Sequence, residues 1–171
     1  MSAQTSTKID YSKIDATPLF NKPQELEKVL YALTQPNNAD LKKATFLLRE
    51  FLSKPESVEP LIEQISKSNK SAVRQIAAVY LREQIEEYWK KIPLNVKNNL
   101  KQFLLKKLLN CDTRAERLAI GAAISSIGKY SFVKKNQHWK ELIILLQDVC
   151  NNTSKNNTDV REIGYTIWRN L

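Results

Sequence analysis

Apolar residues recur every three or four positions along most of the chain after residue 22, which is the spacing of one face of an α-helix. The prolines all stand in loops or first helical turns, where a missing N–H costs nothing. No long window alternates strictly between apolar and polar residues, so the pattern gives no signal for β-strands. The pattern predicts eight helices, over residues 24–34, 39–53, 57–66, 71–91, 93–110, 112–129, 137–151 and 157–171.

The second helix of each predicted pair carries a small residue at a matching position. These anchors are Ala44, Ala77, Ala119 and Gly164, which lie 33, 42 and 45 residues apart. Four positions later three pairs carry a large apolar residue (Leu48, Leu81 and Trp168), whereas the third pair has Ala123. A small residue lets neighbouring helices approach closely, and a large one fills the adjacent groove. The period predicts an all-α HEAT-repeat solenoid, a right-handed superhelix of stacked antiparallel helix pairs. The alternative is a compact eight-helix bundle with chance self-similarity.

The repeats are expected to occupy residues 23–171 as about four helix pairs. Residues 1–22 are polar with isolated apolar positions, which predicts a flexible N-terminal tail. The alternative is that apolar residues of this tail dock onto the first helices; the candidates are Ile9, Tyr11, Ile14 and Leu19.

The run from Arg74 to Arg82, RQIAAVYLR, followed by Ile85 and Trp89, resembles the N-terminal domain of the importin-β (karyopherin-β) superfamily. The preceding positions Leu26, Leu30, Leu33 and Pro36, and then Lys43, Ala44 and Leu48, share this resemblance, which extends over residues 23–146. Among members it is most similar to fungal import receptors of the importin-four type, which carry ribosomal proteins and histones. Such receptors are several times longer, so the resemblance implies that this chain is the first part of one.

The resemblance also implies a function. In these receptors the first repeats bind the GTP form of the small GTPase Ran on the concave surface formed by the second helices, and Ran-GTP releases import cargo in the nucleus. Cargo and nucleoporin sites lie mostly in later repeats. We therefore expect a non-enzymatic protein without cofactor that shuttles between cytoplasm and nucleus.

The expected Ran-binding residues come from positions two before and five after each anchor, which lie seven residues apart and so share one helical face. In the first three pairs the polar members are Lys42, Arg49, Gln75, Arg82 and Arg117. A solvated helix face explains the same pattern. Arg74 and Arg161 share another register, three before their anchors, and fit either a structural ladder between repeats or a partner contact.

Net charge is concentrated in one part of the chain. The total is +9, and residues 91–135 hold ten Lys and Arg against Asp112 and Glu116. Lys97, Lys101, Lys106 and Lys107 form a candidate basic patch on one helix, for RNA, DNA or an acidic partner. The alternative is a solubilising convex face. Because no aromatic residues interleave with these lysines, nucleic acid is an improbable ligand. The rival function is a HEAT-repeat scaffold that assembles an enzyme complex or binds nucleic acid through this patch.

The remaining composition argues against an enzyme. The chain has one histidine, two cysteines (Cys111 and Cys150) and three widely separated glycines, so no catalytic triad, metal cluster or glycine-rich phosphate loop is predicted. No apolar run is long enough to span a bilayer, and the first twenty residues lack the apolar core of a signal peptide. We expect a protein that is not secreted and does not interact with membranes.

Overall fold

The computed structural model describes residues 15–35, 38–133, 139–151 and 158–171, and in these ranges its regular structure is helical throughout. The elements are α1 (Pro18–Asn21), α2 (Pro23–Ala32), α3 (Asn38–Leu52), the 3₁₀ helix η2 (Pro55–Ser57), α4 (Val58–Lys67), α5 (Ser71–Tyr88), α6 (Leu94–Leu109), α7 (Arg114–Val133), α8 (Lys140–Asn151) and α9 (Thr158–Arg169). The eight predicted helices are therefore present as α2 to α9, with ends that differ by a few residues.

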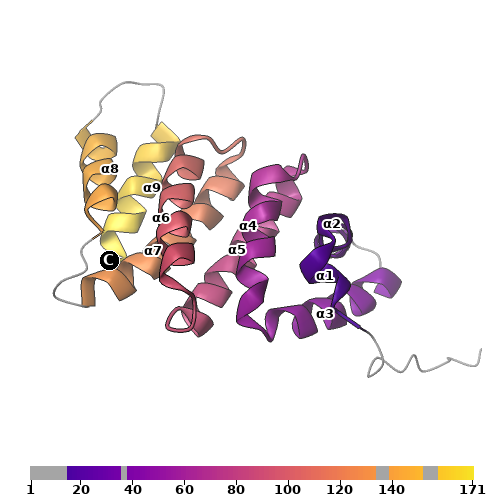
Figure 1. Ribbon diagram of the computed structural model, residues 1–171. Helices are drawn as coiled ribbons and strands as arrows, with labels where there is room; N and C mark the ends of the chain where they lie inside the picture. Colours follow the sequence, from indigo (N-terminus) through magenta and orange to yellow (C-terminus); the bar gives the residue numbers. More distant parts are fainter. Residues whose placement is uncertain (1–14, 36–37, 134–138, 152–157) are drawn as a thin grey trace, which may run out of the picture.

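The helices are stacked in a row, with α2 and α9 at opposite ends (Figure 1). Within the pairs, α4 packs on α5, α6 on α7 and α8 on α9, while α5 packs along α7 and α7 along α9. The all-α HEAT-like solenoid is confirmed, and the alternative of a closed bundle is wrong. The right-handed sense of the superhelix stays a prediction.

The first pair joins this row differently. Helix α3 packs on α2 and on η2, and α2 in turn packs on both α4 and α5. The end of α3 is tied to α5 by side chains: Gln84 Nε2 donates to the Leu52 carbonyl at 3.1 Å, and the Tyr88 hydroxyl donates to the Ser53 carbonyl at 2.9 Å. The C-terminal end of α3 thus meets α5, whereas α5 and α7 pack against each other along their length.

The anchors of the repeat lie in the core. Ala44, Ala77, Ala119 and Gly164 are all buried. Of the large residues four positions later, Leu48 and Leu81 are buried, as expected of groove-filling side chains. Trp168 is 56% exposed, so the expectation that it packs in the core is wrong. It stands on the outer side of α9, beside Phe132 and Leu171.

Part of the expected N-terminal tail is folded. Residues 15–22 include α1, in which Leu19 is buried and Phe20 packs on Phe51 of α3 with ring centroids 4.7 Å apart. Pro18 opens this short helix, and a second proline, Pro23, opens α2 directly after it. Docking of Leu19, the alternative that the sequence leaves open, is what the structure shows. Ile9, Tyr11 and Ile14 lie outside the described residues.

The close approach of α9 to α7 depends on a glycine. A Cβ atom placed on Gly121 would lie 2.7 Å from Cγ2 of Ile163, a β-branched and fully buried side chain of α9. A Cβ on Gly128 would instead meet the Leu171 side chain at the end of the described chain, which can move away. Both glycines lie on α7, two turns apart, so they offer a matched comparison.

We predict that Gly121→Ala destabilises the fold by about 1–2 kcal/mol, because overpacking against Ile163 outweighs the better helix propensity of alanine. Gly128→Ala gains the same propensity with little strain and should be neutral or slightly stabilising. Urea unfolding of both variants, followed by circular dichroism, measures the difference. Equal free energies of unfolding for the two variants would contradict this account of the α7–α9 contact.

Candidate interaction surfaces

A buried ion cluster joins three helices at the centre of the array. Nε of Arg74 on α5 donates to Oε1 of Glu116 on α7 at 2.9 Å, and Nζ of Lys107 on α6 lies 3.0 Å from the same oxygen. Arg74 also pairs with Asp112 and donates to the Ser68 carbonyl at 2.8 Å. The Glu116 side chain is fully buried, and the Arg74 side chain is 7% exposed. Arg74 therefore makes a structural contact between repeats. Of the two roles that the sequence leaves open for it, this is the structural one and not the partner contact.

The same cluster explains the start of α7. The Thr113 hydroxyl accepts the backbone N–H of Glu116 at 3.1 Å, whereas the neighbouring Asp112 pairs with Arg74. Threonine followed three residues later by glutamate is the sequence of a capping box. Here the glutamate carboxylate points away to Arg74 and Lys107 instead of returning to the cap.

The cluster sets the protonation states around it. Burial alone would raise the pKa of Glu116, but hydrogen bonds from Arg74 and Lys107 outweigh it and hold the pKa below the ordinary value of 4.5. Burial, with a contribution from Glu116, raises the pKa of the Cys111 thiol to about 11. Cys111 is therefore a protonated, unreactive thiol at neutral pH, whose sulfur lies 3.1 Å from the Lys107 carbonyl.

We predict that Arg74→Met costs about 3–5 kcal/mol of stability, because it removes one partner of a buried pair and leaves the Glu116 carboxylate undercompensated. Arg114→Met is the control. It breaks the Arg114–Glu162 pair between α7 and α9, whose side chains are both more than half exposed, and should cost at most about 1 kcal/mol. Chemical denaturation measures both losses. Similar losses for the two variants would show that burial does not determine how much each ion pair contributes to the free energy of unfolding.

The lowered pKa of Glu116 also predicts acid sensitivity. A folded-state pKa below the unfolded value means that the stabilisation is present above the unfolded pKa and is lost as the pH falls through the folded one. Between about pH 6 and about pH 3, Glu116→Gln should flatten the fall in the free energy of unfolding relative to the parent chain. Urea titrations at each pH measure this slope. If Glu116→Gln loses stability with acid as steeply as the parent, Glu116 is not the group responsible for the acid sensitivity.

The expected Ran-binding residues on α5 and α7 differ in how exposed they are to solvent. On α5, Gln75 is exposed, and the Arg82 side chain is 41% exposed with Nε 3.7 Å from the Glu86 carboxylate. Arg117 on α7 is half-buried, and its guanidinium donates to the Cys111 carbonyl at 2.9 Å, so it has a structural contact at the end of α6. Ile124, the next position of this face, is fully buried. The exposed part of the face is therefore on α5 rather than α7.

Lys42 and Arg49 on α3 are both exposed. Arg49 lies three residues before Leu52, in the end of α3 that meets α5, whereas Lys42 lies two turns further from this junction. Because α3 meets α5 at one end, the structure brings Arg49 closer to the α5 face than Lys42. We call Arg49, Gln75 and Arg82 the second-helix row.

The expected basic patch is divided. Lys107 points into the ion cluster, and its side chain is only 16% exposed, while Lys106 is exposed. Lys97 and Lys101 are half-buried near the start of α6. A continuous patch formed by these four lysines is therefore wrong.

The expectation that no aromatic residues accompany these lysines is also wrong. Nζ of Lys97 lies 5.2 Å from the ring centroid of Trp89, and Nζ of Lys101 lies 5.3 Å from that of Trp139. Trp89 stacks on Tyr130 with centroids 6.0 Å apart. These rings come from the residue after α5, from α7 and from the residue before α8, so no local spacing in the sequence could show them.

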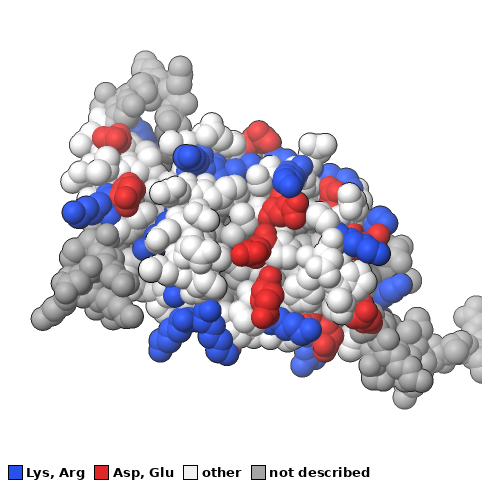
Figure 2. All heavy atoms as spheres, in the orientation of Figure 1, with Lys and Arg blue, Asp and Glu red and all other residues white. Residues whose placement is uncertain are grey.

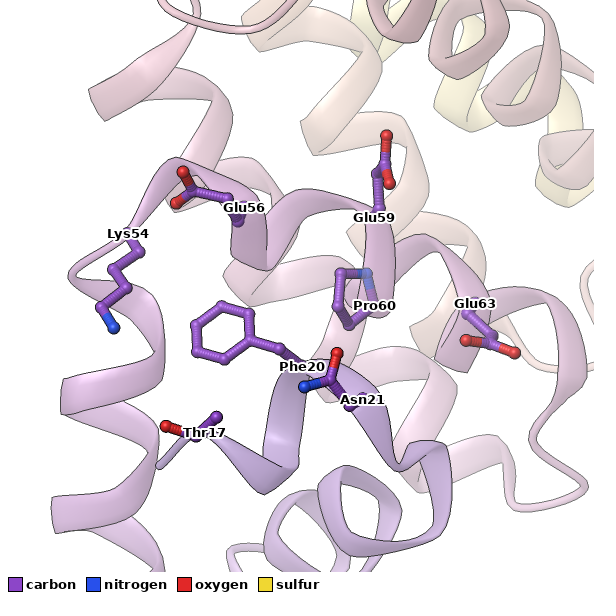
Figure 3. A pocket seen from close by; sticks show the side chains of 8 residues that line it. All are labelled: Thr17, Phe20, Asn21, Lys54, Glu56, Glu59, Pro60 and Glu63. Atoms are coloured by element: carbon purple, nitrogen blue, oxygen red, sulfur yellow. The ribbon is translucent and has the colours of Figure 1, made fainter. Parts of the chain in front are cut away.

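A pocket of about 630 Å³ opens between α1 and α4 (Figure 3). Phe20 stands in its centre, with Lys54 Nζ 5.5 Å from the ring centroid, and Glu56, Glu59 and Glu63 follow η2 and α4 along one side. In the space-filling view, acidic side chains gather over α4 on this face (Figure 2). This pocket was not predictable from the sequence, because one of its walls is the segment expected to be a tail.

Of the helices in the described ranges, none is long and apolar enough to cross a membrane. Nor do the His, Cys, Asp and Glu side chains placed in the structure form a group of three that could hold a metal ion.

The fold and the solvent-facing second helices define an α-helical repeat protein. Residues 44–110 match the importin-β N-terminal domain. The chain is 24% identical to importin-4 of Mus musculus over 147 residues, which are 85% of this chain and 13% of that protein. It is 26% identical to the probable importin subunit beta-4 of Schizosaccharomyces pombe over 144 residues, 84% of this chain and 13% of that protein.

The resemblance that the sequence predicts is thus confirmed: residues 44–110 match the importin-β N-terminal domain, and most of the chain is similar to two importins. Helices α3 to α6, with the Arg74–Arg82 run, lie within or overlap the matched residues. The chain spans about an eighth of the length of the relatives that it matches.

Proposed function

We propose that this chain is the N-terminal part of a nuclear import receptor, and that it binds the GTP form of Ran through the second-helix row. The observation that carries the proposal is the match of residues 44–110 to the importin-β N-terminal domain. The resemblance assigns Ran binding to second helices of the first repeats, and the row lies on α3 and α5, which are such helices. The mechanism is binding without catalysis.

Arg82 is the best candidate for an anchor of this interface. Interfaces draw most of their binding free energy from a few residues, and arginine is frequent among them. The Arg82 side chain is 41% exposed, so a partner can reach it, and its Nε lies 3.7 Å from the Glu86 carboxylate. Arg117 is a weaker candidate, because its guanidinium already contacts the Cys111 carbonyl.

The wider role follows from the same proposal. Cargo such as ribosomal proteins or histones, and nucleoporins, would bind a longer receptor of which this chain is the first part. This receptor would shuttle between cytoplasm and nucleus. The rival function is a repeat scaffold for an enzyme complex or for nucleic acid. The burial of Lys107 in the ion cluster makes the four lysines a weaker basis for that rival.

The test is a titration of the chain with Ran loaded with a non-hydrolysable GTP analogue or with GDP. We expect binding of the GTP form and much weaker binding of the GDP form. Equal affinities for the two forms, or no binding of either, would overturn the proposal.

We predict that Arg82→Glu weakens binding of the GTP form by about 1–3 kcal/mol, because it removes a contact and inserts the opposite charge. Lys106→Glu makes the same change of charge on α6, outside the second-helix row, and is the control. Calorimetric titration measures both affinities, and thermal melting checks that both variants are folded. If Lys106→Glu weakens binding more than Arg82→Glu, the binding face is on the first helices instead.

A further inference from the structure

A second surface lies where α5 ends and α6 begins. Trp89, Lys90, Leu94, Lys97, Lys101 and Tyr130 line a pocket of about 260 Å³ there. The charged side chains that line it, within the described part of the chain, are Lys90, Lys97 and Lys101. We call it the lysine–tryptophan pocket.

The wall of this pocket is held in place by contacts between α7 and the end of α5. The Tyr130 hydroxyl of α7 donates to the Glu86 carbonyl of α5 at 2.8 Å, and the Tyr130 ring stacks on Trp89, with 21° between the ring planes. Ser126, one turn before Tyr130, donates to the Glu86 carboxylate at 2.7 Å. The aromatic floor is therefore fixed before any ligand arrives, which lowers the entropic cost of binding.

The lysines are positioned by these rings. The Lys97 ammonium lies over Trp89 and the Lys101 ammonium over Trp139, so cation–π attraction restricts both side chains. Burial lowers the pKa of Lys101; Glu141 opposes this shift and Lys97 adds to it. Two half-buried ammonium groups beside the exposed Lys90 create a local positive potential at this pocket.

We propose that the lysine–tryptophan pocket docks an acidic peptide segment of a partner protein, whose Asp or Glu carboxylates pair with Lys90, Lys97 and Lys101. Its volume is below the ~300–1,000 Å³ of most small-molecule sites, which suits side chains of a protein partner. Single-stranded nucleic acid is disfavoured because it binds by stacking bases on aromatic rings. Trp89 already has Tyr130 and Lys97 as ring partners.

The proposal does not depend on Ran binding, and a decaglutamate peptide with a fluorescent label tests it by anisotropy. The parent chain should bind this peptide, with an affinity that falls as salt is added. Lys97→Glu/Lys101→Glu should weaken binding by roughly tenfold or more, since both contacts are replaced by repulsion. Lys97→Gln/Lys101→Gln should give a smaller loss, because it removes the contacts without adding repulsion.

The matched control is Lys43→Glu/Lys106→Glu. It changes the net charge by the same amount at two exposed positions that do not line the pocket, and its affinity should stay close to that of the parent. Equal losses in the two Glu double variants would show general charge attraction and overturn the proposal. No binding of decaglutamate would overturn it as well. Tighter binding of an oligothymidylate that depends on Lys97 and Lys101 would make the pocket a nucleic-acid site instead.

Discussion

The contact between Arg74 and Glu116 fixes how the second repeat meets the third. Both side chains are removed from water, so neither can lose its partner without leaving a buried charge. Lys107 brings α6 into the same cluster, and the Ser68 carbonyl adds the loop before α5. One set of charges thereby sets the axial register between α5 and α7. The position of the lysine–tryptophan pocket, which Trp89 after α5 and Tyr130 of α7 both line, follows from this register.

Packing of small residues then determines how closely the helices approach. Ala77 and Ala78 on α5 and Ala119 and Ala123 on α7 are buried along the contact between these two helices. On the next contact, Gly121 makes room for Ile163. The ion cluster thus specifies one register, and the small side chains allow the helices to come together in it.

Local periodicity was sufficient to predict α2 to α9, the pairing and the anchors, because helix period and small-residue spacing are properties of neighbouring positions. Contacts between distant residues were not predictable. Helix α1 has only four residues and is held by Phe51, thirty-one residues after Phe20. Asp112 pairs with Arg74, which lies thirty-eight residues earlier. Of the expected Ran-binding residues, the sequence could not show that Arg117 is engaged by a carbonyl.

The excess of positive charge in residues 91–135 consequently has several structural roles. Lys107 and Arg117 bind groups of the chain itself, Glu116 and the Cys111 carbonyl, and so stabilise the junction of α6 and α7. Lys97 and Lys101 lie over aromatic rings from other helices and face solvent at one pocket. Counting charges treats these groups as equivalent, although the first pair is held inside the junction and the second pair lines a pocket. The second-helix row lies on α3 and α5, whereas the lysines of the pocket follow the end of α5 or belong to α6.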